Sequence, residues 1–344
     1  MSQKNIDLAC IGSSCVDVIM SVTDVFRFEM IDAHSPDVVK KYTAIEYSSK
    51  LNVSSVKFAP GGSAANVAAN LGNLNAFKTA YIGILGDDAM GKLARDDLAK
   101  AQVDLESCFF TRADSTAVSV ILITPLGKDR SILAYKGANN LLKPSDIKDD
   151  FLARCKNLQW TSLTSTSAIQ AIDKCIDAIK RSGGNVYACP SISIIKNAHD
   201  AAANLVSKSD FLVLNKEELQ ELTWNSNLMH ALGDALAMGP RIVACTDGGN
   251  GSFITDGKTL ISAGVYQVEV ADTTGAGDAF ASGLIYAQMN GMPLDQMARY
   301  GAAMAAFECS VTGVRDGIPH DVNILKDYIS KNALKIEVSA FKMP

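Results

Sequence analysis

The chain has 344 residues, and its 32 Lys and Arg against 37 Asp and Glu give a formal net charge of −5 at pH 7. This mild acidic balance does not favour a nucleic-acid binder, which usually carries a basic patch, so we expect no nucleic-acid partner. Hydrophobic residues make up 48% of the sequence, which excludes a disordered or collagen-like chain and supplies a large core.

Targeting and metal signals are weak along the whole sequence. The first ten residues contain no apolar run of signal-peptide length, and no stretch approaches the roughly 18 apolar residues of a membrane span. We therefore expect a cytoplasmic protein with no membrane partner. The four His show no zinc-binding spacing, and the eight Cys contain no CxxC pair, so buried or free thiols are expected.

In chain order, the sequence begins with an apolar strand at 6–11, followed by a charged, Tyr-rich insertion at 21–55 with a few exposed strands. A helix of small residues is expected at 64–74, a buried strand at 80–85 and a helix at 91–101. Further strands are expected at 108–111, 117–124 and 131–135. Beyond these, helices at 147–155, 167–181 and 197–208 alternate with apolar runs at 158–163, 185–189, 211–214 and 241–245.

This alternation is the βαβ rhythm of a parallel sheet with helices on both faces. Such sheets bind ligands at the carboxyl ends of their strands, and the polar clusters described next follow predicted strands. One core with a strand-rich insertion fits this pattern better than two domains in series.

The strongest local signal is the run DTTGAGD at 272–278, between an alternating strand expected at 264–271 and a helix expected at 279–289. The small residues Gly275, Ala276 and Gly277 leave main-chain N–H groups uncovered at a helix N-terminus, an environment that suits a phosphate. Asp278 is either a dipole-stabilising residue of the first turn or the group that accepts a proton from an attacking hydroxyl.

A second glycine-rich run, PGGSAAN at 60–66, also precedes a helix. Gly62 lets the backbone approach a ligand closely, and Asn66 could bind hydroxyl groups from the first turn. The alternative is a tight loop in which Ser63 is the N-cap. Asp17, beyond the first strand, is either an ordinary surface acid or an acceptor of hydrogen bonds from a polyol.

Two further clusters follow strands in the second half of the chain. Asn215 and Glu218 form either a capping box or, if phosphates lie nearby, a site where a carboxylate holds Mg²⁺ through water. The run TDGGNG, with Thr246, Gly248 and Gly251, is either a hairpin turn or a loop lying against a nucleotide.

Taken together and in this order, the motifs resemble those of the ribokinase-like (PfkB) carbohydrate kinase family over almost the whole chain. GGSAANVAANLG at 61–72 resembles the family's N-terminal motif, and VADTTGAGDAFASGLI at 270–285 resembles its C-terminal motif. NKEE at 215–218 and TDGGNG at 246–251 are similar to its NxxE and TxGxxG motifs.

The resemblance implies a three-layer α/β/α fold with a central, mostly parallel sheet and a small β-sheet lid. The core would comprise 1–17, 59–105 and 126–344, and the lid 18–58 and 106–125. It implies ATP-dependent, Mg²⁺-assisted phosphoryl transfer to the primary hydroxyl of a sugar. The loop at 311–319 resembles the family's monovalent-cation loop, so K⁺ is also implied.

The resemblance assigns roles to single residues. Asp278 would be the general base, with the amides from Gly275 through Ala276 and Gly277 as the anion hole. The acceptor would be held by Asp17, Gly62 and Asn66, the nucleotide by Asn215, Thr246, Gly248 and Gly251, and the metal by Glu218.

Two departures from the family pattern put ribose itself in doubt as the acceptor: Cys15 replaces an Asn, and Cys189-Pro190-Ser191 replaces an Asp-x-Asn-like stretch. A nucleoside such as adenosine is the alternative acceptor, for which an aromatic wall would come from Phe26, Phe28, Tyr42, Tyr47, Phe109 or Phe110. A non-catalytic ligand-binding protein is a more remote alternative. A homodimer formed through the lid is also predicted, because open sheet edges invite partners.

Overall fold

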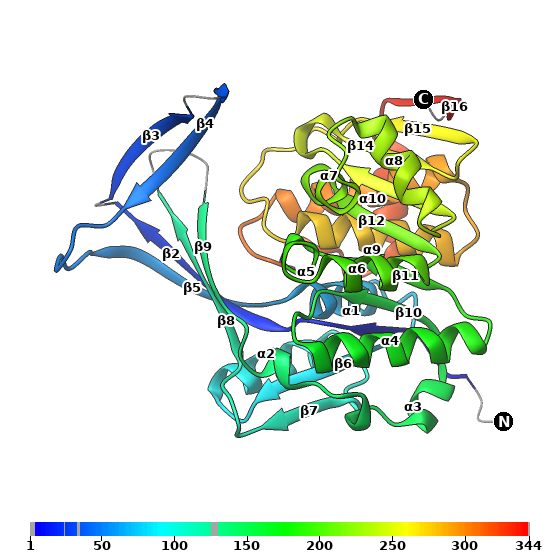
Figure 1. The fold of residues 1–344 in the computed structure, drawn as a ribbon, viewed down its shortest axis with the longest axis horizontal. Helices are drawn as coiled ribbons and strands as arrows, with labels where there is room; N and C mark the ends of the chain where they lie inside the picture. Colours follow the sequence, from blue (N-terminus) through cyan, green and yellow to red (C-terminus); the bar gives the residue numbers. More distant parts are fainter. Residues whose placement is uncertain (1–3, 24, 33–34, 125–129, 343–344) are drawn as a thin grey trace.

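A ten-stranded sheet forms the centre of the computed structural model, which describes residues 4–23, 25–32, 35–124 and 130–342 (Figure 1). In spatial order its strands are β16 (Ile336–Ala340), β15 (Thr259–Ala263), β14 (Ser252–Thr255), β13 (Ile242–Thr246), β12 (Phe211–Asn215), β11 (Val186–Cys189), β10 (Cys155–Thr161), β1 (Ile6–Ile11), β6 (Thr79–Gly86) and β7 (Cys108–Thr111). All neighbours from β7 to β13 pair in parallel, and the three pairs from β13 to β16 are antiparallel.

Helices cover both faces of this sheet and bury two separate apolar clusters. On β1, Leu8 and Cys10 face one cluster while Ala9 and Ile11 face the other, the alternation expected of a strand buried on both sides. The first cluster includes α1 (Ser63–Asn73), α2 (Ala89–Lys100), α9 (Ala276–Met289), α10 (Leu294–Cys309) and α11 (Val322–Lys331). The second includes α3 (Asp149–Ala153), α4 (Thr166–Arg181), α5 (Ile192–Asn197), α6 (His199–Ser207), α7 (Lys216–Thr223) and α8 (Leu228–Ala237).

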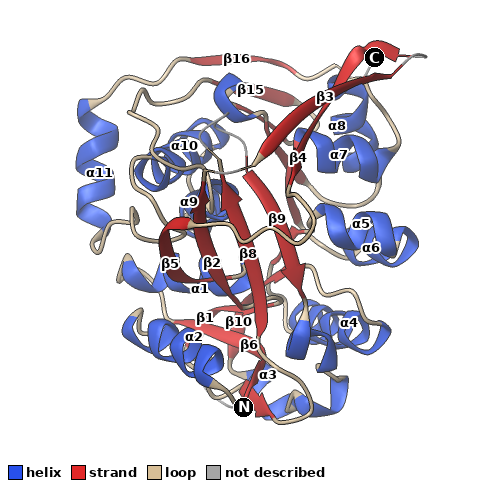
Figure 2. Ribbon diagram, turned by 90° about the vertical axis from the view of Figure 1, so that its left-hand side faces the viewer, coloured by secondary structure: helices blue, strands red, loops and turns tan. Residues whose placement is uncertain are grey.

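A smaller sheet projects from one side of this core, and we call it the lid sheet. It consists of β5 (Val53–Gly61), β2 (Cys15–Val22), β8 (Ala117–Ile123) and β9 (Arg130–Tyr135), which run side by side in front of the core in Figure 2. A hairpin of β3 (Phe26–Asp32) and β4 (Ser35–Ala44) extends beyond it. Phe28 stacks on Tyr42 in this hairpin, with ring centroids 5.4 Å apart.

The two sheets divide the chain near the expected lid boundaries of 18–58 and 106–125, with differences at the ends. Strand β7 pairs with β6 in the large sheet, whereas β9 pairs with β8 in the lid sheet. Strand β2 begins at Cys15 and β5 runs on to Gly61, so both strands enter the core directly. Hydrophobic patterns mark strands but not their partners, which explains why the sequence misplaces β7 and β9. Residues 24, 33, 34 and 125 lie outside the described residues.

One predicted strand is wrong. The stretch 264–271 forms no strand, although its residues alternate as a strand would. Residues 264–268 and 270 instead line a cavity, and Val265, Gln267 and Val270 among them are also exposed, so the alternation does not mark the two faces of a strand. The helix predicted at 197–208 is present as α6, which begins directly after the short helix α5. Ser63 is not the N-cap of α1, because Gly62 occupies that position.

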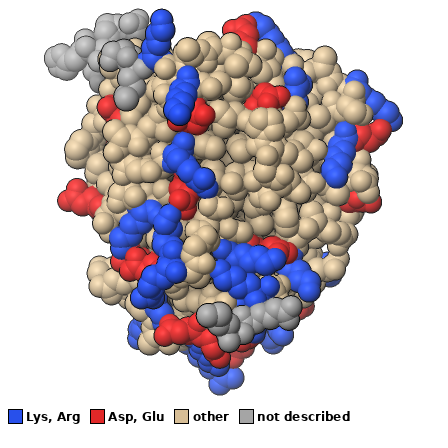
Figure 3. All heavy atoms as spheres, turned by 90° about the vertical axis from the view of Figure 1, so that its right-hand side faces the viewer, with Lys and Arg blue, Asp and Glu red and all other residues tan. Residues whose placement is uncertain are grey.

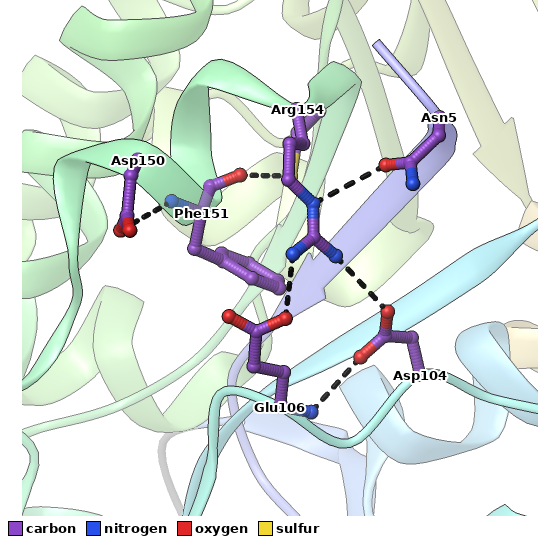
Figure 4. Close-up of polar contacts among 7 residues, drawn as sticks. Asn5, Asp104, Glu106, Asp150, Phe151 and Arg154 are labelled. Atoms are coloured by element: carbon purple, nitrogen blue, oxygen red, sulfur yellow. Dashed lines mark hydrogen bonds and ion pairs between the residues drawn. The ribbon is translucent and has the colours of Figure 1, made fainter. Parts of the chain in front are cut away.

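Arg154 ties the edge of the large sheet to the segment before β7 (Figure 4). Its guanidinium forms ion pairs with Asp104 at 3.3 Å and Glu106 at 2.6 Å, and it donates a hydrogen bond to Asn5. The same guanidinium lies 5.6 Å from the ring centre of Phe151. This cluster joins three separate segments of the chain far from the lid sheet, which is consistent with a structural role.

On the face shown in Figure 3, Lys and Arg side chains lie among Asp and Glu side chains. Within the part of the chain that the structure describes, no helix is both long and apolar enough to cross a membrane.

Candidate active site

The loop before α9 has the geometry of an anion-binding turn. Gly275 is the N-cap of α9 and adopts a left-handed conformation with φ of 79°. A Cβ atom there would lie 2.5 Å from the carbonyl oxygen of Val314, so only glycine fits. A Cβ on Gly277 would meet no protein atom within 4 Å, so open space lies beside this backbone at the positive end of the helix dipole.

Asp278 lies in the first turn of α9 and is held by a residue distant in sequence. Asn66 Nδ2, on α1, donates to Asp278 Oδ2 at 2.6 Å. Burial raises the pKa of Asp278 above its usual value, while hydrogen bonds from Asn66 and Ser63 and the charge of Arg315 oppose this rise. A carboxylate that is partly desolvated yet still anchored is a suitable proton acceptor.

Asp278 faces a polar cavity of about 230 Å³ between the lid sheet and the core, which we call the acceptor cavity. Asp17, Gly62 and Asn66 line it, as the sequence predicts for an acceptor site. Its other polar lining residues are mostly hydroxyl-bearing: Ser13, Ser63, Ser119, Ser162, Ser191, Ser193 and Thr274, with Asn139 and Lys136. This lining suits a small ligand rich in hydroxyl groups.

Asp17 projects from β2 into the acceptor cavity and is only 6% exposed. The thiol of Cys15 donates a long hydrogen bond of 3.4 Å to Asp17 Oδ1, and burial keeps the pKa of this thiol far above its usual value. Close packing surrounds the carboxylate, because a Cβ on Gly61 would lie 2.5 Å from Asp17 Oδ2. Cys15 therefore acts here as a neutral polar group rather than as a nucleophile.

A second cavity, of about 430 Å³, lies on the other side of the α9 N-terminus, and we call it the nucleotide cavity. Four of the predicted nucleotide residues line it, namely Asn215, Thr246, Gly248 and Gly251, together with Ala276 and Gly277. Most of its remaining wall is apolar and comes from α9, α10 and the stretch 264–270: Val265, Val268, Val270, Phe280, Ala302, Ala305 and Ala306. The run 246–251 is the hairpin connection from β13 to β14, and residues of the same run line this cavity.

A narrow cavity of about 130 Å³ joins these two. It shares Asp278 with the acceptor cavity and Gly277 with the nucleotide cavity, and Glu218 also lines it. Cys189 and Ser191, from the stretch that departs from the family pattern, lie along the same passage. The three cavities therefore adjoin one another along the N-terminus of α9.

Glu218 forms a capping box with Asn215, which is one of the two roles that the sequence left open for this pair. Glu218 N donates to Asn215 Oδ1 at 2.9 Å, and Asn215 N donates to Glu218 Oε2 at 3.0 Å, which completes a capping box on α7. Ile192 N donates to the second oxygen, Oε1, at 3.2 Å. Burial raises the pKa of Glu218, and the nearby charge of Asp278 raises it further. A cation in the joining cavity would relieve this repulsion.

Sequence reasoning gave no role to Arg315, whose charge acts on two residues of the candidate site. It lies in the loop after α10, with a side chain only 9% exposed, and its Nη1 is 3.0 Å from Asp97. Its charge favours ionisation of both Asp278 and Cys15. No local motif marks Arg315, because it reaches the site only through folding. Ser63, which we interpreted as a cap, lies instead within hydrogen-bond reach of Asp278.

Comparison with known proteins identifies the family of this chain. Residues 7–321 match the model of the pfkB family carbohydrate kinases. An ATP-dependent ribose-1-phosphate kinase from Halopiger xanaduensis is 30% identical over 272 residues, which cover 78% of this chain and 87% of the relative.

Two solved structures share the fold. Adenosine kinase from Sinorhizobium meliloti superposes with a TM-score of 0.78 at 25% identity, covering 94% of this chain and 99% of that one. A putative ribokinase II from E. coli, solved with ATP and Mg²⁺, superposes with a TM-score of 0.79 at 19% identity and similar coverage, 95% and 99%.

These comparisons confirm the ribokinase-like fold, a large and mostly parallel sheet between helices with a small separate sheet. They also confirm a kinase, a phosphotransferase with an alcohol group as acceptor. The chain belongs to the pfkB family of carbohydrate kinases.

Proposed function

We propose that this protein transfers the terminal phosphoryl group of ATP to the primary hydroxyl of a sugar, with Asp278 as the general base. The observation that carries this proposal is the position of Asp278, which lines both the acceptor cavity and the passage to the nucleotide cavity. A hydroxyl beside Asp278 and a phosphate beside Gly277 would thus meet at the N-terminus of α9.

The nucleotide cavity fits ATP on two grounds. Its volume of about 430 Å³ lies within the usual range for small-molecule sites, about 300–1,000 Å³. Cβ atoms on Gly248, Gly249 and Gly277 would meet no protein atom within 4 Å, so these backbones leave room for a ligand to lie directly against them. The apolar wall at Phe280 and Ala302 suits a base, and the glycine backbones suit the phosphates.

The residues also fit one Mg²⁺ ion held mainly by the nucleotide. Among the described residues, no group of three His, Cys, Asp or Glu side chains could hold a metal. Mg²⁺ commonly uses one or two carboxylates together with water and substrate phosphates, and Glu218 is the carboxylate in the joining cavity. When bound, Mg²⁺ neutralises phosphate charge during the transfer.

The chain's own residues have separate roles in this proposal. Asp17 and Asn66 orient the acceptor, and Asp278 accepts the proton that the attacking hydroxyl loses. The main-chain amides from Gly275 to Asp278 stabilise the charge that develops on the transferred phosphoryl group. Closure of the lid sheet over the acceptor cavity would exclude water, which otherwise competes as an acceptor.

The lining of the acceptor cavity favours a sugar over a nucleoside. None of the six aromatic residues considered for a base-binding wall lines this cavity within the described part of the chain; Tyr135 is the aromatic residue that does. A nucleoside remains the second candidate, because one neighbour of the same fold is an adenosine kinase. A phosphorylated sugar is the third, since Lys136 lines the cavity and one relative is named for ribose 1-phosphate.

The test measures ADP release with panels of sugars, sugar phosphates and nucleosides. The Asp278→Asn variant should lose about 10²–10⁴-fold in turnover, because the acceptor hydroxyl keeps its proton. Asp295→Asn is the matched control, since Asp295 lies in the first turn of α10 and lines none of the three cavities. Undiminished turnover by Asp278→Asn would refute the assignment of the base.

We also propose a homodimer through the lid sheet and activation by K⁺. Large apolar side chains on the lid sheet and hairpin are exposed, among them Phe26, Phe58 and Leu133. Sedimentation should show a species of twice 36.5 kDa, and a species of 36.5 kDa alone would remove the dimer. Equal ADP release in KCl and in choline chloride would remove the role of K⁺.

A further inference from the structure

A buried polar contact joins α1 to α9, and no part of the proposed mechanism uses it. Asn70 Nδ2, on α1, donates to Ser282 Oγ, on α9, at 3.2 Å. Asn70 is 1% exposed and Ser282 is 0% exposed, and Asn70 Oδ1 has no hydrogen-bond partner among the described residues. Burial of such polar groups is costly, so their place between two helices whose buried residues are mostly small and apolar requires an explanation.

This contact repeats, one turn further along both helices, the contact that holds the proposed base. Asn66 Nδ2 donates to Asp278 Oδ2 at 2.6 Å. Asn66 and Asn70 are four residues apart on α1, and Asp278 and Ser282 are four residues apart on α9, so each pair lies on one face of its helix. Two contacts separated by one turn on both helices fix how far along α9 the helix α1 lies.

Ser282 also connects α1 to the main chain of the proposed base. Ser282 Oγ donates to the carbonyl oxygen of Asp278 at 2.7 Å. A hydroxyl has a single proton, so Ser282 Oγ is the acceptor in its contact with Asn70 Nδ2. Asp278 is therefore attached to α1 twice, through its side chain by Asn66 and through its main chain by Ser282 and Asn70.

The carboxylate of Asp278 takes its position from α1. In the described part of the chain, its side-chain hydrogen bonds come from Asn66 and Ser63, which both belong to α1. These two residues also line the acceptor cavity. A shift of α1 along α9 would therefore displace the acceptor and the proposed base relative to each other. Buried polar contacts fix the register of packed helices in other proteins.

We propose that Asn70 and Ser282 are positioning residues for phosphoryl transfer: their hydrogen bond sets the register of α1 on α9 and so holds Asp278 against the acceptor hydroxyl. This inference rests on the proposed function. Neither residue is among those that line the three cavities, so both act through Asn66 and Asp278. A small displacement of α1 has a large effect, because a misplacement of about 1 Å at the reacting atoms costs about 10²-fold in rate.

Two single variants test the contact from its two sides. Ser282→Ala removes the shared hydroxyl and should lower kcat about 10–100-fold, because the register of α1 on α9 is then no longer fixed. Asn70→Ala removes the other partner and should lower kcat in the same way, which keeps the test open if one variant does not fold. The dissociation constant of ATP should not change, since none of the described residues that line the nucleotide cavity belongs to α1.

Ser209→Ala is the matched control. Ser209 is 3% exposed, and its Oγ accepts from Trp160 Nε1 at 3.0 Å and donates to the carbonyl oxygen of Leu205, four residues earlier, at 2.9 Å. Ser282 has the same two kinds of partner, but Ser209 lines none of the three cavities. Both substitutions should lower the melting temperature, and only Ser282→Ala should lower kcat measured well below that temperature. An equal fall of kcat in Ser209→Ala, or wild-type kcat in Ser282→Ala, would overturn the inference.

A double variant separates positioning from packing. Asn70→Leu combined with Ser282→Ala replaces both partners by apolar groups and leaves no unpaired polar atom between the helices, so the melting temperature should recover relative to Ser282→Ala. The value of kcat should stay low, because apolar side chains supply no directional contact. Recovery of kcat together with the melting temperature would show that the pair serves packing alone.

The Asn66→Ala background tests whether the effect passes through Asn66. There, Ser282→Ala should lower kcat by less than it does in the wild type, because the contact that the register maintains is already lost. Equal losses in the two backgrounds would contradict the proposed route.

A crystal structure of Ser282→Ala gives a readout that does not depend on transfer. The distance from Asn66 Nδ2 to Asp278 Oδ2 should exceed about 3.5 Å, the limit of a hydrogen bond. If no acceptor is phosphorylated but this distance lengthens, the proposed function fails while the role of the Asn70–Ser282 contact in the register stands. If the wild type transfers phosphate but Ser282→Ala keeps both this hydrogen bond and wild-type kcat, the inference fails alone.

Discussion

The nucleotide cavity and the acceptor cavity are built from different parts of the fold. Most of the nucleotide cavity is formed by core elements, and residues such as Phe280 and Ala306 belong to the buried cluster under α9 and α10. The acceptor cavity is closed on one side by the lid sheet, whose own apolar cluster is small. If the proposed function holds, binding of the nucleotide is therefore linked to the stability of the core, whereas acceptor choice depends on a few polar groups on a lightly packed sheet.

After the loss expected for Asp278→Asn, the largest effect should come from the loop between the two cavities. Gly275→Ala forces a left-handed backbone and a 2.5 Å contact with the carbonyl of Val314, so the amides should move out of position. Loss of such donors typically costs about 10²–10³-fold in turnover. Gly277→Ala is the control, because its Cβ meets no protein atom and should weaken ATP binding without lowering the melting temperature. Equal losses of stability in both variants would contradict this distinction.

A substitution in the acceptor cavity should leave the affinity for the nucleotide unchanged. Asp17→Asn removes a charged hydrogen-bond acceptor worth about 1.5–3 kcal/mol, so kcat/KM for the sugar should fall about 10–150-fold. The dissociation constant of ATP, measured by calorimetry, should not change. Asp96→Asn, an exposed acid on α2, provides the comparison. Weaker ATP binding in Asp17→Asn would mean that the two cavities are not separable as described.

A variant of Glu218 tests whether the carboxylate in the joining cavity holds Mg²⁺. Glu218→Gln keeps an oxygen for the capping box but removes the charge, so the Mg²⁺ concentration needed for half-maximal rate should rise about 10–100-fold. The neighbouring Glu217→Gln, on an exposed side chain paired with Lys196, should leave that concentration unchanged. Identical Mg²⁺ dependence in the two variants would leave Glu218 with a capping role only.

The smallest effect expected is on the acid side of the pH profile. Burial raises the pKa of Asp278 above 3.8, so its basic form is lost as pH falls through that raised value and kcat/KM should decline there. Removing the hydrogen bond in Asn66→Ala takes away a group that lowers this pKa, so the decline should begin at higher pH. If kcat/KM of Asn66→Ala declines at the same pH as that of the wild type, a group other than Asp278 causes the decline at low pH.

Local patterns in the sequence predict much of the core and of the candidate site. Strand β1 begins and ends as expected, and glycines followed by small residues mark the starts of α1 and α9. These signals are strong because a buried parallel strand and a glycine-rich helix start each impose requirements on adjacent residues.

The features that sequence reasoning missed depend on contacts across the fold. Arg315 lies in the loop after α10, and its charge acts on Asp278 only because the chain folds, so no spacing within the sequence indicates this. The stretch 264–271 has the alternation of a strand, but it has no neighbouring strand to pair with. Alternation of apolar and polar residues therefore does not by itself show that a segment pairs within a sheet.

The most direct test of the central claim is a crystal structure with ADP, Mg²⁺ and the sugar that supports turnover. The proposed function predicts that the sugar's primary hydroxyl oxygen lies within hydrogen-bond distance of Asp278 and that its other hydroxyls contact Asp17 and Asn66. It also predicts that the β-phosphate is directed toward the amides of Gly275 to Gly277. A sugar bound outside the acceptor cavity, or one whose primary hydroxyl points away from Asp278, would contradict it.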